Sequence, residues 1–188
     1  MSVQSGHHRI GPEQGRLLLR TFREGMAASV GHDLVIELTR WSAELTAAGE
    51  ATGSSLVAKL DLNSLSVREG TGGIKPLTDR DRRDIAFNAR KQLSADRYPE
   101  AVFTSSSVSP DDKGGGAVDG ILTLLGVDRP LRLSIVDEGA GRYRGTARVV
   151  QSEYGIKPYS AMLGALKVRD AIEVEIEVDL SGPGGAAS

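Results

Sequence analysis

The chain has 188 residues, of which 39% are hydrophobic and 26% are charged, values typical of one ordinary globular domain. Its 23 basic and 25 acidic residues give a formal net charge of -2, so it lacks the excess positive charge that a nucleic-acid backbone attracts. Cysteine is absent, which excludes disulfides, thiolate nucleophiles and metal sites with cysteine ligands. We therefore expect no nucleic-acid partner and no redox chemistry on the protein.

Two stretches are expected to lie outside the folded domain. Residues 1–13 and 181–188 are polar or glycine-rich and have few apolar side chains to bury, so we predict two disordered tails and one domain over residues 14–180. The first stretch has no apolar run of the kind found in secretory signals, and no run of roughly 18 apolar residues occurs in the chain. We expect a cytoplasmic protein without a membrane span.

The first predicted strand spans residues 34–45. Its apolar row consists of Leu34, Ile36 and Leu38 and then, after a shift of parity, of Trp41, Ala43 and Leu45. Side chains alternate between the two faces of a strand, so this shift predicts a β-bulge near Thr39–Arg40, a feature that bends sheets into barrels. A second row follows at Leu56, Ala58, Leu60 and Leu62.

One segment departs from this alternation. Thr78 is a suitable N-cap, acidic residues follow it in the first turn, and Ile85, Ala89 and Leu93 recur at helical spacing. This pattern predicts an α-helix from Asp79 to about Leu93, which would cap or flank a sheet. The dipeptide Tyr98–Pro99 then forces extended geometry and leads into a strand over residues 101–107.

Three more apolar rows follow the helix. They are Val118, Gly120, Leu122 and Leu124; then Leu131, Leu133 and Ile135; and last Ile172, Val174, Ile176, Val178 and Leu180. The last row alternates with Glu173, Glu175, Glu177 and Asp179, which predicts one buried and one solvent-facing side. Clusters of Gly, Pro, Asn and Asp separate the rows, as in all-β proteins, and the sequence therefore predicts a small antiparallel barrel with an apolar interior.

Four motifs in this order resemble the YceI-like family of bacterial lipid-binding proteins. They are Tyr98–Pro99 with the extended stretch to Ser105, the run Gly120–Leu131, the turn Tyr154–Gly155–Ile156, and the closing segment Val168–Ile172. The resemblance runs from about Gly15 to Leu180. It implies a lipocalin-like, antiparallel eight-stranded β-barrel with one flanking α-helix, which holds a polyisoprenoid or isoprenoid-quinone chain along its axis and catalyses no reaction.

The inward rows supply the predicted wall of the ligand site: Leu34, Ile36, Leu38, Leu56, Ala58, Leu60, Leu122, Leu124, Leu133, Ile135, Val174 and Ile176. Only 4% of the residues are aromatic, and the rows include Ala58 and Gly120, so such a barrel would stay partly unfilled and attract an apolar guest. His32 and Tyr154 are candidates for contacting a lipid head group at the mouth. We expect no catalytic residue, no metal site and no cofactor other than bound lipid.

The sequence thus predicts a non-enzymatic protein that binds, carries or sequesters a long apolar lipid. One alternative is an enzyme that acts on a small apolar substrate in the same cavity, with His32 or Tyr154 as acid or base. Another is a barrel filled by its own side chains that serves as a structural or interaction module. The expected partner is an apolar lipid ligand, and the oligomeric state stays open, a homodimer being one candidate.

Overall fold

The computed structural model describes residues 5–48 and 50–181 and consists mainly of antiparallel β-strands. The long strands are β1 (Gly6–Ile10), β2 (Gly15–Thr21), β4 (His32–Leu38), β5 (Trp41–Ala47), β6 (Ser55–Asp61), β7 (Leu65–Gly72), β8 (Glu100–Pro110), β9 (Gly116–Leu124), β10 (Val127–Gly139), β11 (Arg142–Val150) and β14 (Ala171–Asp179). They form one sheet in the order β1-β5-β6-β8-β9-β10-β11-β14-β2-β4-β7. The short strands β3 (Arg23–Glu24), β12 (Ser160–Ala161) and β13 (Leu166–Val168) form a second sheet. The predicted all-β class is confirmed.

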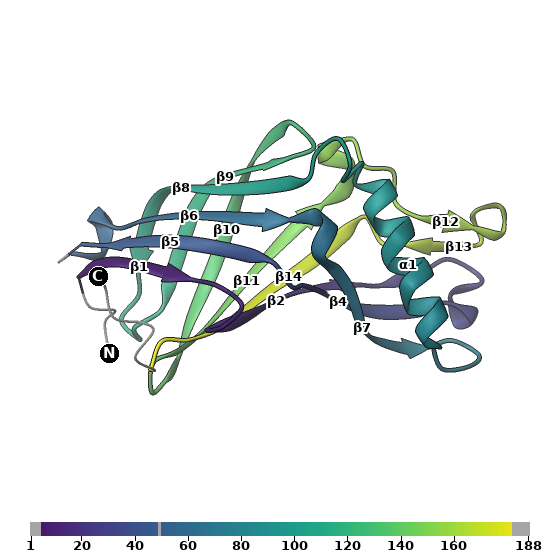
Figure 1. The fold of residues 1–188 in the computed structure, drawn as a ribbon, viewed down its shortest axis with the longest axis horizontal. Helices are drawn as coiled ribbons and strands as arrows, with labels where there is room; N and C mark the ends of the chain where they lie inside the picture. Colours follow the sequence, from purple (N-terminus) through teal and green to yellow (C-terminus); the bar gives the residue numbers. More distant parts are fainter. Residues whose placement is uncertain (1–4, 49, 182–188) are drawn as a thin grey trace.

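The large sheet is strongly curled into a half-barrel (Figure 1). Its eleven strands differ in number from the predicted eight. The difference arises because three strands are broken: β1 and β2, β4 and β5, and β6 and β7 follow each other in the chain but pair with different neighbours. If each broken pair is counted as one bent strand, the eleven become eight, so the resemblance predicted the path of the chain but not the breaks.

The bulge predicted near Thr39–Arg40 is wrong, because the chain breaks there into two strands. β4 pairs with β2 and β7, whereas β5 pairs with β1 and β6. Buried Ser64 holds this corner: its carbonyl accepts a hydrogen bond from the Thr39 amide at 3.2 Å, and its Oγ accepts one from the Arg40 amide at 3.0 Å. The parity shift therefore marks a corner that keeps both apolar rows facing inward.

The predicted N-terminal tail is wrong for part of its length. Residues Gly6–Ile10 form β1, which pairs with β5 from Gly6 opposite Ala47 to Ile10 opposite Ala43. His8 and Ile10 are buried, so the segment does contribute side chains to the core. Residues 1–4 and 182–188 of the predicted tails lie outside the described residues, and Ser181 donates its amide to the Asp179 carboxylate at 2.9 Å.

The predicted helix is confirmed as α1 (Asp79–Gln92), which lies across the end of the sheet opposite β1 (Figure 1). Thr78 forms a reciprocal capping box with Asp81: the Thr78 Oγ1 accepts from the Asp81 amide at 3.2 Å, and the Asp81 carboxylate accepts from the Thr78 amide at 2.8 Å. The helix packs on β7. Among the described residues, no helix has the length and apolar character needed to cross a bilayer.

The core consists of two clusters of buried side chains that share partly buried residues such as Leu60 and Val174. One cluster contains Phe103 and Leu133, and the other contains Leu17 and Trp41. Gly120 was predicted to leave interior space unfilled. Instead, the Phe103 ring fills it, since a Cβ on Gly120 would fall 2.7 Å from the ring Cζ. A few large rings therefore fill part of the barrel despite the low aromatic content.

Candidate functional site

The curled sheet is hollow at the end covered by α1. A cavity of about 430 Å³ lies between α1 and the inner faces of several strands, β2, β4, β9 and β14 among them. This is nearly three times the roughly 150 Å³ of an apolar cavity that stays dry and binds benzene, and it falls within the usual size of ligand pockets. The cavity is therefore large enough for a small-molecule guest.

Seven of the predicted wall residues line this cavity. They are Leu34, Ile36, Leu38, Leu60, Leu122, Leu124 and Val174. Whether a predicted residue lines the cavity depends on its position along the strand. Leu60, near the end of β6, lines the cavity, and Leu56, near the start of β6, does not. These seven residues form an apolar wall, and their contact with a ligand stays a prediction.

The other five predicted wall residues lie outside the cavity and pack in the core. They are Leu56, Ala58, Leu133, Ile135 and Ile176. Leu133 and Ile135 face Gly145, where a Cβ would lie 3.2 Å from a terminal carbon of each side chain. The barrel is thus filled by its own residues in one half and hollow in the other. The alternative of a barrel filled by its own side chains therefore describes only the filled half.

Both β2 and β4 carry a row of cavity residues that changes from apolar to polar along the strand. On β2 the row runs Leu17, Leu19 and Thr21 and continues to Arg23. On β4 it runs in the opposite chain direction, from Leu38, Ile36 and Leu34 to His32. Because the two strands are antiparallel, with Leu17 opposite Leu38 and Thr21 opposite Leu34, the polar ends lie together. The cavity is therefore amphipathic, with a deep apolar part and a polar mouth.

Thr21 stands at the boundary between these two parts. Only 9% of the residue is exposed, and its Oγ1 atom is buried without a hydrogen-bond partner among the described residues. A buried hydroxyl without a partner is unfavourable by about 1–3 kcal/mol. Thr21 also lines the cavity with its other atoms, so a rotation about χ1 is needed before this hydroxyl meets a polar atom of a guest.

The mouth carries several charged and amide side chains. Arg23 donates from Nη1 to the Gly31 carbonyl at 2.5 Å, and its own amide donates to the Asp33 carboxylate at 2.8 Å. These bonds hold the start of the loop between β3 and β4 in place. The other polar cavity residues come from α1, β13 and the segment after β11: Asn88, Gln92, Gln151 and Lys167. Such groups suit a head group with hydrogen-bond acceptors.

The structure separates the two residues predicted at the mouth. His32 lines the cavity, and its contact with a lipid head group stays a prediction. Tyr154 does not line the cavity: only 3% of it is exposed, it belongs to the core, and burial raises the pKa of its phenol. Its position at the end of the 3-10 turn Gln151–Tyr154 points it inward, which the sequence motif did not reveal. The two residues named by the enzyme alternative therefore do not share a site.

Several walls of the cavity were not predicted from the sequence, and two of them carry a recognisable sequence pattern. One is β2, where Leu17, Leu19 and Thr21 alternate, although the unbroken run Leu17–Leu18–Leu19 hides this period. The other is α1, which contributes Ile85, Ala89 and Leu93. These three residues are the ones whose spacing predicted the helix, so the same pattern could have identified its inward face.

Solved structures with the same fold cover most of this chain. BcnA from Burkholderia cenocepacia superposes with a TM-score of 0.59 at 16% identity, covering 86% of this chain and 94% of BcnA. A polyisoprenoid binding domain from Saccharophagus degradans gives 0.54 at 13% identity, covering 93% and 97%. A YceI protein from Campylobacter jejuni gives 0.52 at 16% identity, covering 76% and 81%. At these identities the likeness establishes the fold.

Relatives are also found by sequence. A UPF0312 protein of Pseudomonas savastanoi pv. phaseolicola is 27% identical over 117 residues, which are 57% of this chain and 60% of that protein. A UPF0312 protein of Shewanella baltica is 36% identical over 86 residues, 40% of this chain and 44% of that protein. The chain thus matches less than two thirds of the length of these relatives. The model of the YceI-like domain matches residues 9–180, nearly the whole folded part, and the chain therefore belongs to the YceI-like family.

Proposed function

We propose that this protein binds a long apolar lipid of the polyisoprenoid or isoprenoid-quinone type and carries or sequesters it without changing it chemically. The observation that carries this proposal is the amphipathic cavity: Leu and Ile side chains line its deep part, and polar side chains gather at one end. The hydrocarbon tail occupies the deep part, and the head group lies at the mouth beside Thr21, Arg23 and His32.

The gain from burying the tail is large enough to hold it. Each buried methylene contributes roughly 0.8 kcal/mol, so ten such groups contribute about 8 kcal/mol, which is comparable with the cost of association, about 4–15 kcal/mol, and each further group adds to the gain. If benzene in a cavity of roughly 150 Å³ sets the scale, 430 Å³ holds about 17 carbons, or about three prenyl units. A tail of about this length fills the deep part and leaves its head group at the mouth.

The relatives support the choice of ligand. The Saccharophagus degradans protein is described as a polyisoprenoid binding domain, and its fold covers 93% of this chain. The interior here is made mainly of Leu, Ile and Val, whose branched side chains pack against a methyl-branched tail as well as against each other. Selection among lipids would therefore depend on tail shape and on the head group's acceptors.

Binding is favoured over catalysis by the positions of the candidate acids and bases. The Nε2 of His32 faces the Lys75 carbonyl at 2.9 Å, so this ring nitrogen is already engaged by the protein. The Tyr154 hydroxyl lies in the core. Of the two residues, only His32 borders the cavity.

Native mass spectrometry of the freshly purified full chain, followed by denaturing extraction, tests the proposal. We expect a mass shift that disappears on extraction and a prenyl lipid in the extract. In a second arm, the stripped protein is titrated with prenyl alcohols of increasing length. Affinity should rise with each unit up to about three units and then level off, because the cavity is then full. A stripped protein that binds none of these alcohols would refute the proposal.

A further inference from the structure

Large apolar side chains project into solvent around the mouth of the cavity. We call the following five the apolar rim: Met26, Ile74, Tyr159, Met162 and Leu163. Their exposed fractions range from 47% for Tyr159 to 96% for Met26, and Leu163 is fully exposed. Most of the large hydrophobic side chains that are exposed in the described residues belong to this rim. Exposed apolar groups gathered in one place mark a binding surface.

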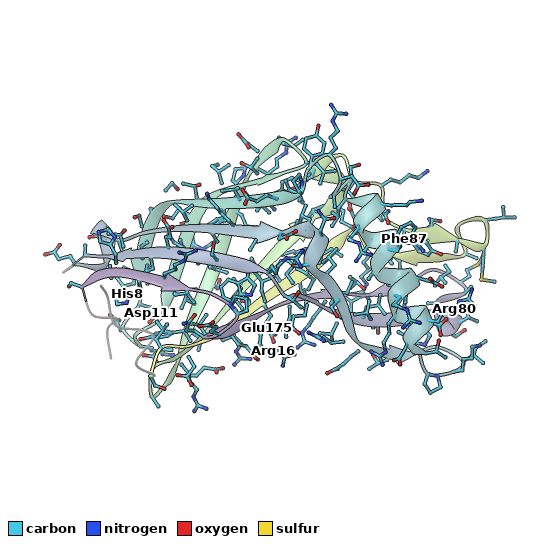
Figure 2. The ribbon with its side chains drawn as sticks, viewed as in Figure 1. His8, Arg16, Arg80, Phe87, Asp111 and Glu175 are labelled. Carbon is cyan, nitrogen blue, oxygen red and sulfur yellow. The ribbon has the colours of Figure 1, made fainter. Side chains whose placement is uncertain are left out.

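The three segments that carry the rim are linked to each other. The Ala27 amide donates to the Ala165 carbonyl at 2.9 Å, which joins the loop of Met26 to that of Leu163. The Nε2 of His32 lies 2.9 Å from the Lys75 carbonyl oxygen. This contact joins the start of β4, which follows the loop of Met26, to the loop of Ile74. Figure 1 shows β12, β13 and the loop between β7 and α1 at the end of the sheet opposite β1, and Figure 2 shows Phe87 of α1 at that same end, far from His8. Tyr159 belongs to the rim and lines the cavity, so one apolar surface continues from inside to outside.

The turn that carries Met162 and Leu163 has an unusual backbone. Their φ angles are 52° and 54°, in the left-handed region that large side chains seldom adopt. A turn with no further role would favour glycine or a short polar residue at such positions. Here the turn instead holds two large apolar side chains in solvent. Packing inside this chain gives no reason for that arrangement.

The charge of the rim segments has the opposite sign from that of the whole chain. Residues 22–31, 70–77 and 156–168 contain four basic residues, Arg23, Lys75, Lys157 and Lys167, and a single acidic residue, Glu24. The complete chain has a net charge of -2. Apolar side chains flanked by lysines are the combination that binds an anionic bilayer surface: the former enter the head-group layer and the latter meet lipid phosphates.

We propose that the apolar rim docks the protein on an anionic lipid bilayer with the cavity mouth facing the membrane, so that a lipid passes between bilayer and cavity without crossing water. The transfer of a lipid rests on the proposed function. The docking on the bilayer depends only on the apolar rim. A bilayer is favoured over a protein partner because the rim surrounds the opening of the cavity, and a protein seated there would close it.

Co-sedimentation of the full chain with lipid vesicles tests the docking. We expect binding to phosphatidylcholine vesicles that contain phosphatidylglycerol and much weaker binding to phosphatidylcholine alone. The double variant Met162→Ser with Leu163→Ser should weaken binding at least about fivefold, and Lys75→Glu with Lys157→Glu at least about tenfold. The matched controls are Val136→Ser, an exposed apolar residue on β10, and Lys113→Glu, in the turn after β8; both should bind like the unmodified protein.

A second measurement is independent of cargo and uses the absence of cysteine from the chain. Leu163→Cys provides a single attachment site for an environment-sensitive fluorophore. Its emission should shift to the blue when anionic vesicles are added, because the label enters the apolar layer. The same label on Val136→Cys should show no shift.

The outcomes separate the docking from the proposed function. If the unmodified protein extracts with a prenyl lipid but neither sediments with vesicles nor shifts the label, the docking is refuted and the carrier role stands. If it docks through the rim but neither extracts with nor binds a prenyl lipid, the docking stands and the carrier role is refuted. If the rim variants abolish self-association measured by analytical ultracentrifugation and leave vesicle binding unchanged, the rim is an interface between copies and the docking is refuted.

Discussion

The Nε2 atom of His32 lies 2.9 Å from the carbonyl oxygen of Lys75, which joins the first residue of β4 to the loop before α1. A carbonyl can only accept a hydrogen bond, so the Nε2 of His32 carries a proton. A single bond of this kind contributes about 0.5–1.5 kcal/mol. We therefore expect His32→Ala to change lipid occupancy by at most a few-fold, measured by extraction. A reaction abolished by this substitution would contradict the non-enzymatic role.

Thr21→Val should act on stability and on binding in opposite directions. Valine has nearly the same shape as threonine and removes the unpaired hydroxyl, so the ligand-free protein should become more stable by about 1 kcal/mol in denaturant unfolding. Affinity for a prenyl alcohol should fall several-fold, because its oxygen loses the Thr21 partner. Affinity for a prenyl hydrocarbon without a head group should not change.

Thr39→Val is the matched control for Thr21→Val. The Thr39 Oγ1 donates to the Ser64 carbonyl at 3.1 Å, so its removal should destabilise the protein and leave affinity for both ligands unchanged. If Thr21→Val also destabilises the ligand-free protein, the hydroxyl has a partner and the proposed head-group contact is wrong.

Filling the cavity should displace the lipid while the fold survives. Ile36→Trp enlarges a cavity residue on β4, and Ala89→Trp enlarges one on α1, so the two variants fill the same space from opposite walls. Overpacking is expected to lower stability by about 1–3 kcal/mol. Lipid content per folded protein should fall strongly in both, measured by extraction alongside thermal unfolding.

Glu37→Gln tests the assigned faces of β4. The Glu37 side chain faces away from the cavity and forms ion pairs with Arg68 and Arg16, at 2.5 Å and 3.6 Å. The substitution should therefore lower stability by up to about 1 kcal/mol and leave lipid content unchanged. Full lipid occupancy in both tryptophan variants, with loss in Glu37→Gln, would show that the faces are inverted.

Gly120→Ala should be destabilising although the residue lies in an ordinary extended strand. A Cβ there would fall 2.4 Å from the Thr104 carbonyl oxygen and 2.7 Å from the Phe103 ring, so the core must shift at an expected loss of about 1–3 kcal/mol. Adding Phe103→Leu should recover part of this loss in a double-mutant cycle. The control is Gly11→Ala, whose Cβ would meet only the Trp41 carbonyl at 3.4 Å and should be nearly neutral.

The cap of α1 should make lipid retention sensitive to acid. Hydrogen bonds from Thr78 lower the pKa of the Asp81 carboxyl below its ordinary value of 3.8. Since the folded pKa is the lower one, this contribution to stability is present above 3.8 and is lost as the pH falls through the folded pKa. In Asp81→Ala the contribution is absent at every pH. Lipid retention by Asp81→Ala at neutral pH, measured by extraction, should then be lower than that of the unmodified protein. As the pH falls below 3.8, lipid retention by the two proteins should become equal.

Asp179→Ala is the control for this pH dependence. Hydrogen bonds from Ser181 also lower the pKa of the Asp179 carboxyl, but Asp179 lies at the end of β14 and does not line the cavity. Its removal should leave lipid retention unchanged at neutral pH. Equal loss in the two variants would show that the acid effect is not specific to the helix cap.

The inner face of β4 could be predicted from sequence because a strand places every second residue on one side. That periodicity alone put Leu34 and Ile36 on the wall. It could not show which part of the barrel is hollow, since that depends on contacts between distant segments. Leu133 follows the same pattern as Leu34, yet it is packed in the core beside Phe103 from another strand.

Some features leave almost no local trace. The pairing of β1 with β5 depends on an edge supplied by residues 41–47, which no pattern in residues 6–10 reveals. The buried hydroxyl of Thr21 is likewise a property of its surroundings, because its period-two position on β2 predicts only an inward direction. The helix was the opposite case: Thr78 and Asp81 form a local motif, and the sequence identified it within one residue at the C-terminal end.

The division of the barrel into a filled half and a hollow half has a consequence for how the protein can vary. Phe103 and Leu133 hold the filled half and do not border the cavity, whereas Leu34 and Ala89 border the cavity and are only partly buried. Exchanges at such partly buried positions can therefore reshape the space offered to a guest while Phe103 and Leu133 stay packed. Descendants of one ancestral chain could in this way come to hold different lipids with the same scaffold.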